Sequence, residues 1–216
     1  NLRAYTRGPQ EMLERTGRRK RREFALSDDA SNGWEAVAQQ FMTARSAIGL
    51  ETVRAWAAAI PPGGSILDLG AGSGVPLAAA LIEQGFVVSA VDASPTLVAA
   101  FRRRFPHAEI ACEPAEHSTF FNHSFHGVMA IGLMFLLPAA AQRAVIERVA
   151  KALRPSGRFL FTAPHEACAW ADCLTGRSSV SLGAEAYGQI LTQVGLVLVG
   201  QYRDEGANHY FEAQKA

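Results

Sequence analysis

The stretch Ile66-Leu67-Asp68-Leu69-Gly70-Ala71-Gly72-Ser73-Gly74-Val75-Pro76 decides which fold the chain is expected to adopt. It begins as a short apolar run, typical of a buried strand, and continues into three alternate glycines. Glycine at a strand end lets the backbone turn tightly and approach a ligand closely. The pattern leaves open which ligand the turn would hold, a dinucleotide with phosphates or a molecule without them.

Downstream of Ser65, strand-like and helix-like segments alternate. Strands are expected at 65–69, 86–91, 109–112, 127–131, 158–162, 196–202 and 209–212, and helices at 75–84, 94–104, 138–153 and 184–194. Strands that are apolar throughout are buried on both faces, which indicates a parallel sheet with helices on both sides. Because the loop 204–208 is too short for a parallel crossover, the last two strands are expected to pair as an antiparallel hairpin.

The chain length and the charge distribution indicate one domain preceded by a basic segment. The chain has 216 residues, of which 49% are hydrophobic and 19% charged, as in a single globular domain. Residues 1–23 carry a net charge of +5, and the remainder carries −4. No aromatic residue interrupts the run from Arg18 to Arg22, so a solvated extension is favoured over a nucleic-acid-binding arm. We expect a single domain over 24–216, with helices at 33–60 divided at Gly49.

Several signals of other protein classes are missing from the sequence. No apolar run reaches the roughly 20 residues of a membrane helix, and the chain starts without a secretory pattern. The cysteines Cys112, Cys168 and Cys173 form no CxxC pair. The histidines His117, His123 and His126 have no partner at metal-ligand spacing. These features predict a cytoplasmic protein without membrane or metal site.

Two carboxylates flank the glycine stretch. Asp92 follows the second expected strand, where its oxygens could accept hydrogen bonds from a ribose diol. A carboxylate at this position could bind the ribose of NAD or of another nucleoside equally well. Asp68 places a negative charge beside the glycines, which would repel a pyrophosphate and attract an ammonium or sulfonium group. The GxGxG spacing also differs from the GxGxxG of dinucleotide sites. S-adenosylmethionine, which has no phosphate, is therefore favoured over NAD.

These residues resemble a known family. Leu67 to Gly74 is similar to the glycine-rich first motif of class I S-adenosylmethionine-dependent methyltransferases, and Leu153 to Arg158 resembles the turn before that family's fifth strand. The resemblance spans roughly residues 34–215. It implies a Rossmann-like, doubly wound α/β sheet of seven mostly parallel strands with the last strand antiparallel, and S-adenosyl-L-methionine as the cofactor. The cofactor-binding residues implied by the motifs and their neighbours are Asp68, Gly70, Ala71, Gly72, Gly74, Asp92, Ala93, Ala115, Glu116, Ile131 and Arg45.

Two departures from the family pattern concern the adenine side and the fourth strand. Pro114 stands where the family often has an aspartate, so either Glu116 or the backbone of Ala115 is expected to contact the adenine amino group. Phe125-His126 stands where the family often has Phe-Asp. That aspartate is mainly structural, so its replacement does not change the expected chemistry.

The acceptor side carries fewer signals. Ile131-Gly132-Leu133-Met134-Phe135 lacks the Asn/Asp-Pro-Pro-aromatic motif of nucleic-acid amino methyltransferases, which favours a small-molecule acceptor over nucleic acid. His165 follows the fifth expected strand and is a candidate base. The long loop expected at 165–183 could contribute to the site. Further polar and aromatic candidates are Trp170, Arg177, Asn208, His209 and Tyr210. The helical segment at 33–60, with Trp34, Phe41 and Arg45, is expected either to form a lid over the cofactor, with Arg45 near its carboxylate, or to be an amphipathic packing helix.

Three functions remain open at this point. The first is in-line methyl transfer to a small molecule, for which positioning and desolvation can suffice without a base. The second is an NAD(P)-dependent oxidoreductase. The third is a protein that binds S-adenosylmethionine without catalysis. The sequence indicates neither the acceptor atom nor the oligomeric state.

Overall fold

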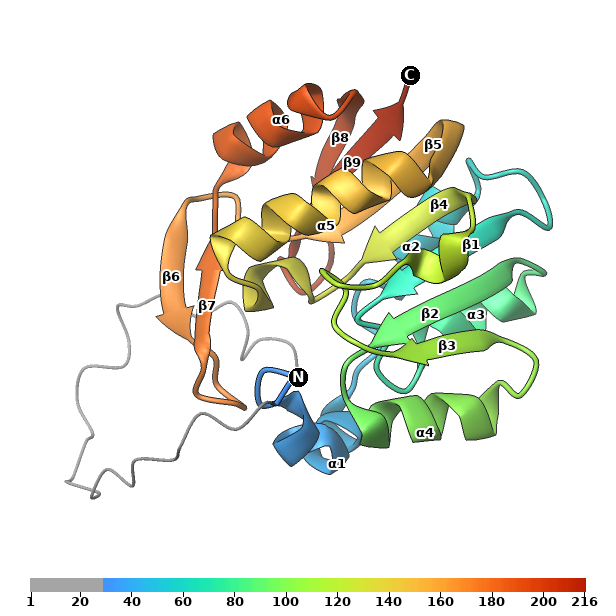
Figure 1. Ribbon diagram of the computed structural model, residues 1–216, viewed down its shortest axis with the longest axis vertical. Coiled ribbons are helices and arrows are strands. Elements are labelled where there is room, and N and C mark those ends of the chain that lie inside the picture. The colour runs from blue at the N-terminus through green and yellow to red at the C-terminus, as the bar shows by residue number, and fades with distance from the viewer. Residues whose placement is uncertain (1–28) are drawn as a thin grey trace.

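The computed structural model describes residues 29–216, and the basic extension expected at 1–23 lies outside the described residues (Figure 1). A seven-stranded sheet forms the centre, in the order β3-β2-β1-β4-β5-β9-β8. Its strands are β1 (Ser65–Leu69), β2 (Val87–Asp92), β3 (Glu109–Cys112), β4 (Phe125–Ala130), β5 (Leu153–Thr162), β8 (Leu196–Arg203) and β9 (His209–Lys215). In this sheet β9 runs opposite to the other six strands, so it pairs antiparallel with β5 and with β8. The expected fold class and the terminal hairpin are confirmed.

Helices cover both faces of the sheet. The helices are α1 (Trp34–Ala44), α2 (Leu50–Ala57), α3 (Leu77–Glu83), α4 (Pro95–Arg104), α5 (Ala139–Ala152) and α6 (Ala184–Gln193), with short 3-10 turns η3 (Phe120–Asn122) and η4 (Met134–Leu136). Gly49 takes a positive φ of 83° before α2, which separates the first two helices as expected. Ser94 caps α4, since its hydroxyl accepts a hydrogen bond from the Leu97 amide at 3.3 Å.

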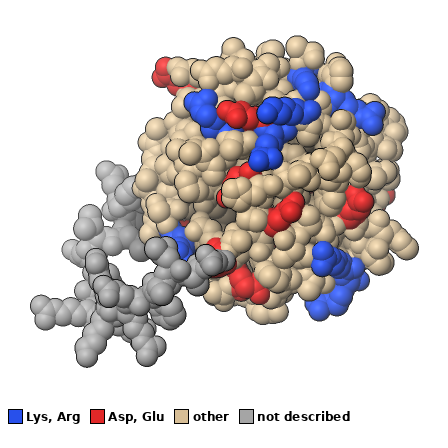
Figure 2. All heavy atoms as spheres, viewed as in Figure 1, with Lys and Arg blue, Asp and Glu red and all other residues tan. Residues whose placement is uncertain are grey.

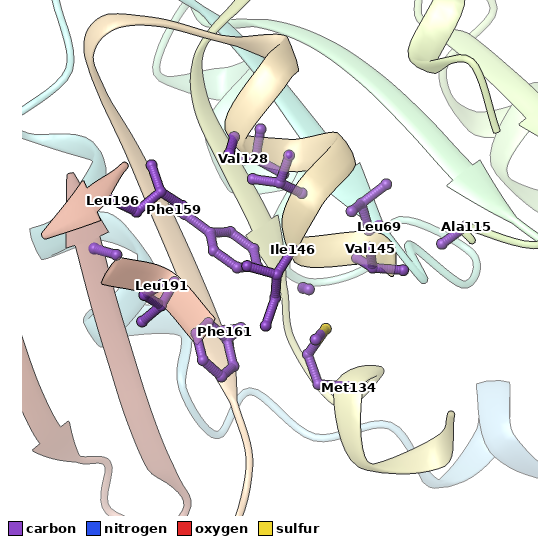
Figure 3. Packing of buried hydrophobic residues seen from close by; sticks show 14 of the residues in the cluster. Leu69, Ala115, Val128, Met134, Val145, Ile146, Phe159, Phe161, Leu191 and Leu196 are labelled. Atoms are coloured by element: carbon purple, nitrogen blue, oxygen red, sulfur yellow. The ribbon is translucent and has the colours of Figure 1, made fainter. Parts of the chain in front are cut away.

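Alternate side chains of the strands build two hydrophobic clusters, one on each face. Leu67 and Leu69 of β1 face a cluster that includes α5 and α6, where Ile146 and Phe161 are fully buried (Figure 3). Ile66 faces the other cluster, which α2, α3 and α4 complete. Burial on both faces is what apolar parallel strands require, and it holds the carboxyl ends of β1, β2 and β4 side by side.

The expectation of a loop at 165–183 is wrong, because this segment forms a separate antiparallel hairpin. Its strands are β6 (Cys168–Ala171) and β7 (Ser178–Ser181). Asp172 shapes the turn: its Oδ1 accepts hydrogen bonds from the Leu174 and Thr175 amides at 3.0 and 2.8 Å. These strands are short and rich in alanine and serine, which have weak strand preference, so their residue pattern carries little strand signal. β5 also begins at Leu153, five residues before the expected position.

None of the helices within residues 29–216 combines the length and the apolar character that crossing a membrane requires.

The basic side chains of the described part gather in separate places on the face shown in Figure 2, one of them the end of α4 with Arg102, Arg103 and Arg104.

Gln142, fully buried on α5, connects three parts of the structure. Its Nε2 donates to the Leu137 carbonyl at 2.8 Å and to the Val180 carbonyl of β7 at 2.9 Å. The Tyr187 hydroxyl of α6 donates to its Oε1 at 2.6 Å. One side chain therefore fixes the end of η4, the hairpin and α6 relative to the helix.

Replacing Gln142 with methionine preserves the length of the side chain but leaves these buried partners unpaired. We expect the free energy of unfolding to fall by about 3 kcal/mol, since each unpaired buried polar group costs about 1–3 kcal/mol. Urea unfolding of Gln142→Met measures this loss. Gln189→Met on the exposed face of α6 is the control, and an equal loss in both variants would contradict the proposed importance of the Gln142 contacts.

Candidate functional site

A cavity of about 560 Å³ opens at the carboxyl ends of β1, β2 and β4. Open parallel sheets bind ligands at this edge, where neighbouring connections leave in opposite directions. Most of the residues expected at the cofactor line the cavity: Arg45, Gly70, Ala71, Gly72, Asp92, Ala93, Ala115, Glu116 and Ile131. Asp68 and Gly74, which were also expected at the cofactor, do not line the cavity.

The glycine turn after β1 depends on positive φ angles. Gly70, Gly72 and Gly74 adopt φ values of 70°, 59° and 79°, a region that side chains other than glycine rarely occupy. A Cβ at Gly74 would lie 2.7 Å from Phe101 and 2.6 Å from Phe105 of the α4 region. Gly74 therefore permits helix packing, whereas Gly70 and Gly72 present their backbone to the cavity.

The backbone amides of this turn bond within the protein. The amides of Gly70 and Ala71 both donate to the Val91 carbonyl, at 2.8 and 3.2 Å, and that of Gly74 to the Ala71 carbonyl at 3.0 Å. The amide of Gly72 donates to Oδ2 of Asp92 at 2.8 Å. A phosphate-binding turn instead directs such amides at its ligand, so this geometry does not resemble a phosphate cradle.

Asp92 ends β2 and lies at the cavity wall. Besides the Gly72 amide, it accepts the Ser94 amide on Oδ1 at 2.8 Å. Burial raises the pKa of the Asp92 carboxyl above its usual value, while these two hydrogen bonds act in the opposite direction. Each carboxylate oxygen has a further lone pair, so the group can still accept hydrogen bonds from a ligand.

Asp68 lies beneath the cavity, only 3% exposed. Burial raises the pKa of its carboxyl to about 7, the positive charge of Arg45 lowers it, and the charge of Asp92 raises it. No hydrogen bond joins the Asp68 side chain to another residue of the described part. A buried carboxylate with so little compensation is stabilised by a cation that enters beside it.

The loop after β3 forms the opposite side of the cavity. Ala115 is 6% exposed, and Pro114 and His117 also line the wall. Oε2 of Glu116 is buried and has no hydrogen-bond partner among the described residues. An unpaired buried acceptor is costly unless a ligand supplies a donor.

Helix α1 covers the glycine turn. Trp34, Phe41 and Arg45 line the cavity, as the predicted lid would require. The rings of Trp34 and Phe41 meet edge to face at 5.2 Å, and the Arg45 guanidinium lies 5.6 Å from the centre of the Phe41 ring. A Cβ at Gly72 would lie 3.1 Å from Phe41, which shows how closely the helix approaches the turn.

The remaining wall lies beyond β4 and is mostly apolar. It comprises Leu133, Phe135, Leu136, Leu137 and Pro138, with Thr162, Asn208 and Tyr210 as polar members. Among these, only Asn208 and Tyr210 were expected near the site. The apolar run that follows β4 could have indicated this wall from the sequence. Thr162, in contrast, has no feature in the sequence that distinguishes it from other strand residues. In the structure its hydroxyl accepts a hydrogen bond from the Gly132 amide at 2.7 Å.

Tyr210 is held as a neutral phenol. Its hydroxyl donates to Oδ2 of Asp204 at 3.0 Å. Burial raises the pKa of the phenol well above its usual value, and Asp204 raises it further. The hydroxyl is therefore not a phenolate base at neutral pH.

Other candidates lie outside the lining of the cavity. His165 has a side chain 47% exposed and meets the His209 ring edge to face at 4.9 Å. Trp170 of β6 packs against Phe135 at 5.6 Å and so supports the cavity wall from behind. Arg177 lies near Gly33 at the tip of the hairpin. The proposed role of His165 as a base gains no support from this placement.

Comparison with known proteins agrees with this geometry. Residues 66–157 match the model of the family described as a methyltransferase domain. The matched part contains the glycine turn, Asp92 and the loop with Glu116. A search of the curated proteins found no match.

Solved structures share the fold at low identity. A Burkholderia thailandensis 1,6-didemethyltoxoflavin-N1-methyltransferase, with bound 1,6-didemethyltoxoflavin and S-adenosylhomocysteine, is 20% identical, covers 85% of this chain and 84% of its own, and has a TM-score of 0.69. The CcbJ methyltransferase from Streptomyces caelestis is 15% identical, with coverage of 88% and 100% and a TM-score of 0.69. The glycopeptide N-methyltransferase MtfA with S-adenosyl-L-methionine is 19% identical, with coverage of 78% and 94% and a TM-score of 0.63.

Fold, site and family match together define a methyltransferase enzyme with S-adenosylmethionine as its cofactor. The family match covers residues 66–157, less than half of the chain, and the chain shares its fold with solved methyltransferases, as the expected resemblance implies. The expectation of this family and its cofactor is confirmed, and the oxidoreductase and non-catalytic alternatives are set aside.

The raised pKa of Asp68 predicts how stability depends on pH. The folded protein binds this proton more tightly than an unfolded chain, whose carboxyl has a pKa near 3.8. Ionisation of Asp68 therefore opposes folding, and its unfavourable contribution develops as the pH rises from about 4 to about 7. Asp68→Asn removes that contribution. One unit of pKa difference corresponds to at most about 1.4 kcal/mol of stability. Without cofactor, we therefore expect the variant to be more stable than the wild type at pH 8 by about 1–3 kcal/mol.

Urea unfolding at pH 8 and pH 5 tests this expectation. The advantage of Asp68→Asn should shrink at the lower pH, where the wild-type carboxyl is mostly protonated in the folded state. A variant that is less stable than the wild type at pH 8 would show that Asp68 is already compensated in the folded protein.

Proposed function

We propose that the cavity at the ends of β1, β2 and β4 holds S-adenosylmethionine and that the chain transfers its methyl group to a small-molecule acceptor. The observation that carries this assignment is the use of the turn's amides within the protein, with one of them bound to Asp92. A turn whose amides are already bonded, flanked by two buried acids, suits a ligand that has positive charge and no phosphate.

The lining residues fit the parts of the cofactor. Asp92 accepts the ribose hydroxyls on its free lone pairs. The unpaired Oε2 of Glu116 fits the adenine amino group as its donor, and Ile131 packs against the adenine ring. Asp68 would stabilise the cationic methionine end, and Arg45 would pair with its carboxylate. We also propose the single domain over 24–216 and the lid over 33–60 on this basis.

The acceptor is proposed to lie against the apolar wall beyond β4. Bound S-adenosylmethionine supplies an electrophilic methyl group on its sulfonium. Leu133, Phe135 and Leu136 exclude water there, and Thr162 and Asn208 can orient the acceptor by hydrogen bonds. Holding the nucleophile in line with the methyl group can supply much of the rate. The Burkholderia enzyme with bound 1,6-didemethyltoxoflavin supports a small molecule as the acceptor class. A cytoplasmic location stays a prediction.

Isothermal titration with S-adenosylhomocysteine and with NAD tests the cofactor site. We expect saturable binding of S-adenosylhomocysteine and none of NAD at the same concentrations, because the bonded amides and buried acids disfavour a pyrophosphate. Micromolar binding of NAD with no response to S-adenosylhomocysteine would overturn the proposal.

Asp92→Ala tests the ribose contact. Hydrogen bonds to a charged group contribute about 1.5–3 kcal/mol, so we expect the affinity for S-adenosylhomocysteine to drop by at least about tenfold. The free energy of unfolding should also fall, by about 1–2 kcal/mol, because the Gly72 and Ser94 amides lose their acceptor. Asp92→Asn retains one acceptor oxygen and should lose less of both quantities.

Affinity and urea unfolding are measured on the wild type and both variants, with Glu83→Gln on the exposed end of α3 as control. Folded Asp92→Ala that binds S-adenosylhomocysteine as tightly as the wild type would remove Asp92 from the site.

A further inference from the structure

Helix α1 covers the cofactor cavity although it buries little of its own surface. Ala38 is the buried residue of this helix, while Trp34, Phe41 and Arg45 are directed at the cavity. A helix with little apolar burial has low local stability against opening. Polar contacts to the body of the domain therefore have a large share in keeping α1 closed.

Glu35, in the first turn of α1, accepts three such hydrogen bonds from the beginning of α4. Its Oε2 accepts a short hydrogen bond from the Ser94 hydroxyl and one from the Thr96 amide at 3.1 Å. Its Oε1 accepts the Thr96 hydroxyl at 2.6 Å. Figure 1 shows α1 beside the beginning of α4, where these donors lie. The Ser94 hydrogen bond lowers the pKa of the Glu35 carboxyl, so it is ionised at neutral pH and faces the positive end of the α4 dipole.

The same Ser94 that bonds Glu35 also bonds Asp92. The hydroxyl of Ser94 donates to Glu35, and its amide donates to Oδ1 of Asp92 at 2.8 Å. Oδ2 of Asp92 in turn accepts the Gly72 amide at 2.8 Å. A continuous series of charge-assisted hydrogen bonds thus runs from the lid helix through Ser94 and Asp92 to the glycine turn.

We propose that Glu35 is a positioning residue for the cofactor: it fixes Asp92 through Ser94, and it holds α1 closed over the glycine turn. The inference rests on the proposed function of this cavity. Loss of the Glu35 carboxylate frees the Ser94 hydroxyl to rotate and releases the N-terminal end of α1. The cofactor then leaves faster, while the sheet and its two hydrophobic clusters remain intact.

Glu35→Gln removes the charge and preserves the shape, and Thr96→Val removes one of the donors from the other side of the contact. The control is Glu51→Gln in α2, where the carboxylate is 77% exposed and pairs with Arg54 three residues away. The affinity and the dissociation rate of S-adenosylhomocysteine are measured on the full chain by calorimetry and stopped-flow fluorescence. Melting of the protein without ligand is recorded for each variant.

For Glu35→Gln we expect affinity about tenfold weaker, mostly through faster dissociation, and a smaller change of the same kind for Thr96→Val. Hydrogen exchange of the amides in 34–44 should increase in both variants. Glu51→Gln should leave all these quantities unchanged. A purely structural role would lower the melting temperature without a selective change in the dissociation rate.

A double-mutant cycle of Glu35→Gln and Asp92→Asn tests the connection through Ser94. The losses in affinity for S-adenosylhomocysteine should be less than additive, because both changes interrupt the same series of hydrogen bonds. Additive losses, or unchanged affinity and dissociation in folded Glu35→Gln, overturn the inference while leaving the proposed function intact. Wild-type protein that fails to bind S-adenosylhomocysteine overturns the proposed function, and the inference with it.

Discussion

The hydrogen bond from the Gly72 amide to the Asp92 carboxylate joins the turn after β1 to the end of β2. Without it, the turn would expose an amide to the cavity and Asp92 would lose an orienting donor. The bond requires Gly72 to adopt a positive φ of 59°, and it requires β1 and β2 to be parallel neighbours that end at the same edge of the sheet. The position of the cavity, the orientation of its acid and the path of the chain into α3 all follow from this contact.

The three alternate glycines consequently have separate physical tasks. Gly72 brings its backbone to Asp92 and leaves room for the Phe41 ring of α1, whereas Gly74 leaves room for Phe101 of α4. A motif that appears uniform in the sequence thus serves a turn, a lid contact and a helix contact. Substitution at each glycine would disturb a different neighbour, although all three share a positive φ.

Much of the architecture could be predicted because its signals are local. Buried parallel strands are apolar throughout, Ser94-Pro95 marks a helix start, and the short loop 204–208 permits only a hairpin. The hairpin β6–β7 could not be predicted in this way, since its stability depends on contacts with distant residues such as Gln142. The same holds for Thr162 and for Glu35, whose partners lie 30 and about 60 residues away along the chain. Ionic and polar contacts of this kind have no periodicity, so only the folded chain shows them.

Asp68, beneath the cavity, and Asp92, at its wall, both have a carboxyl pKa raised by burial, and the charge of Asp92 raises that of Asp68 further. Burying two like charges side by side costs stability in the protein without ligand. Arg45, directly after α1, offsets part of this cost at Asp68. A ligand that carries a sulfonium and an ammonium would offset more of it, so electrostatic strain in the empty site and affinity for a cationic cofactor have the same physical origin. Water excluded by α1 would strengthen both interactions, so the proposed role of the contact that holds this helix has a physical basis in the electrostatics of the site beneath it.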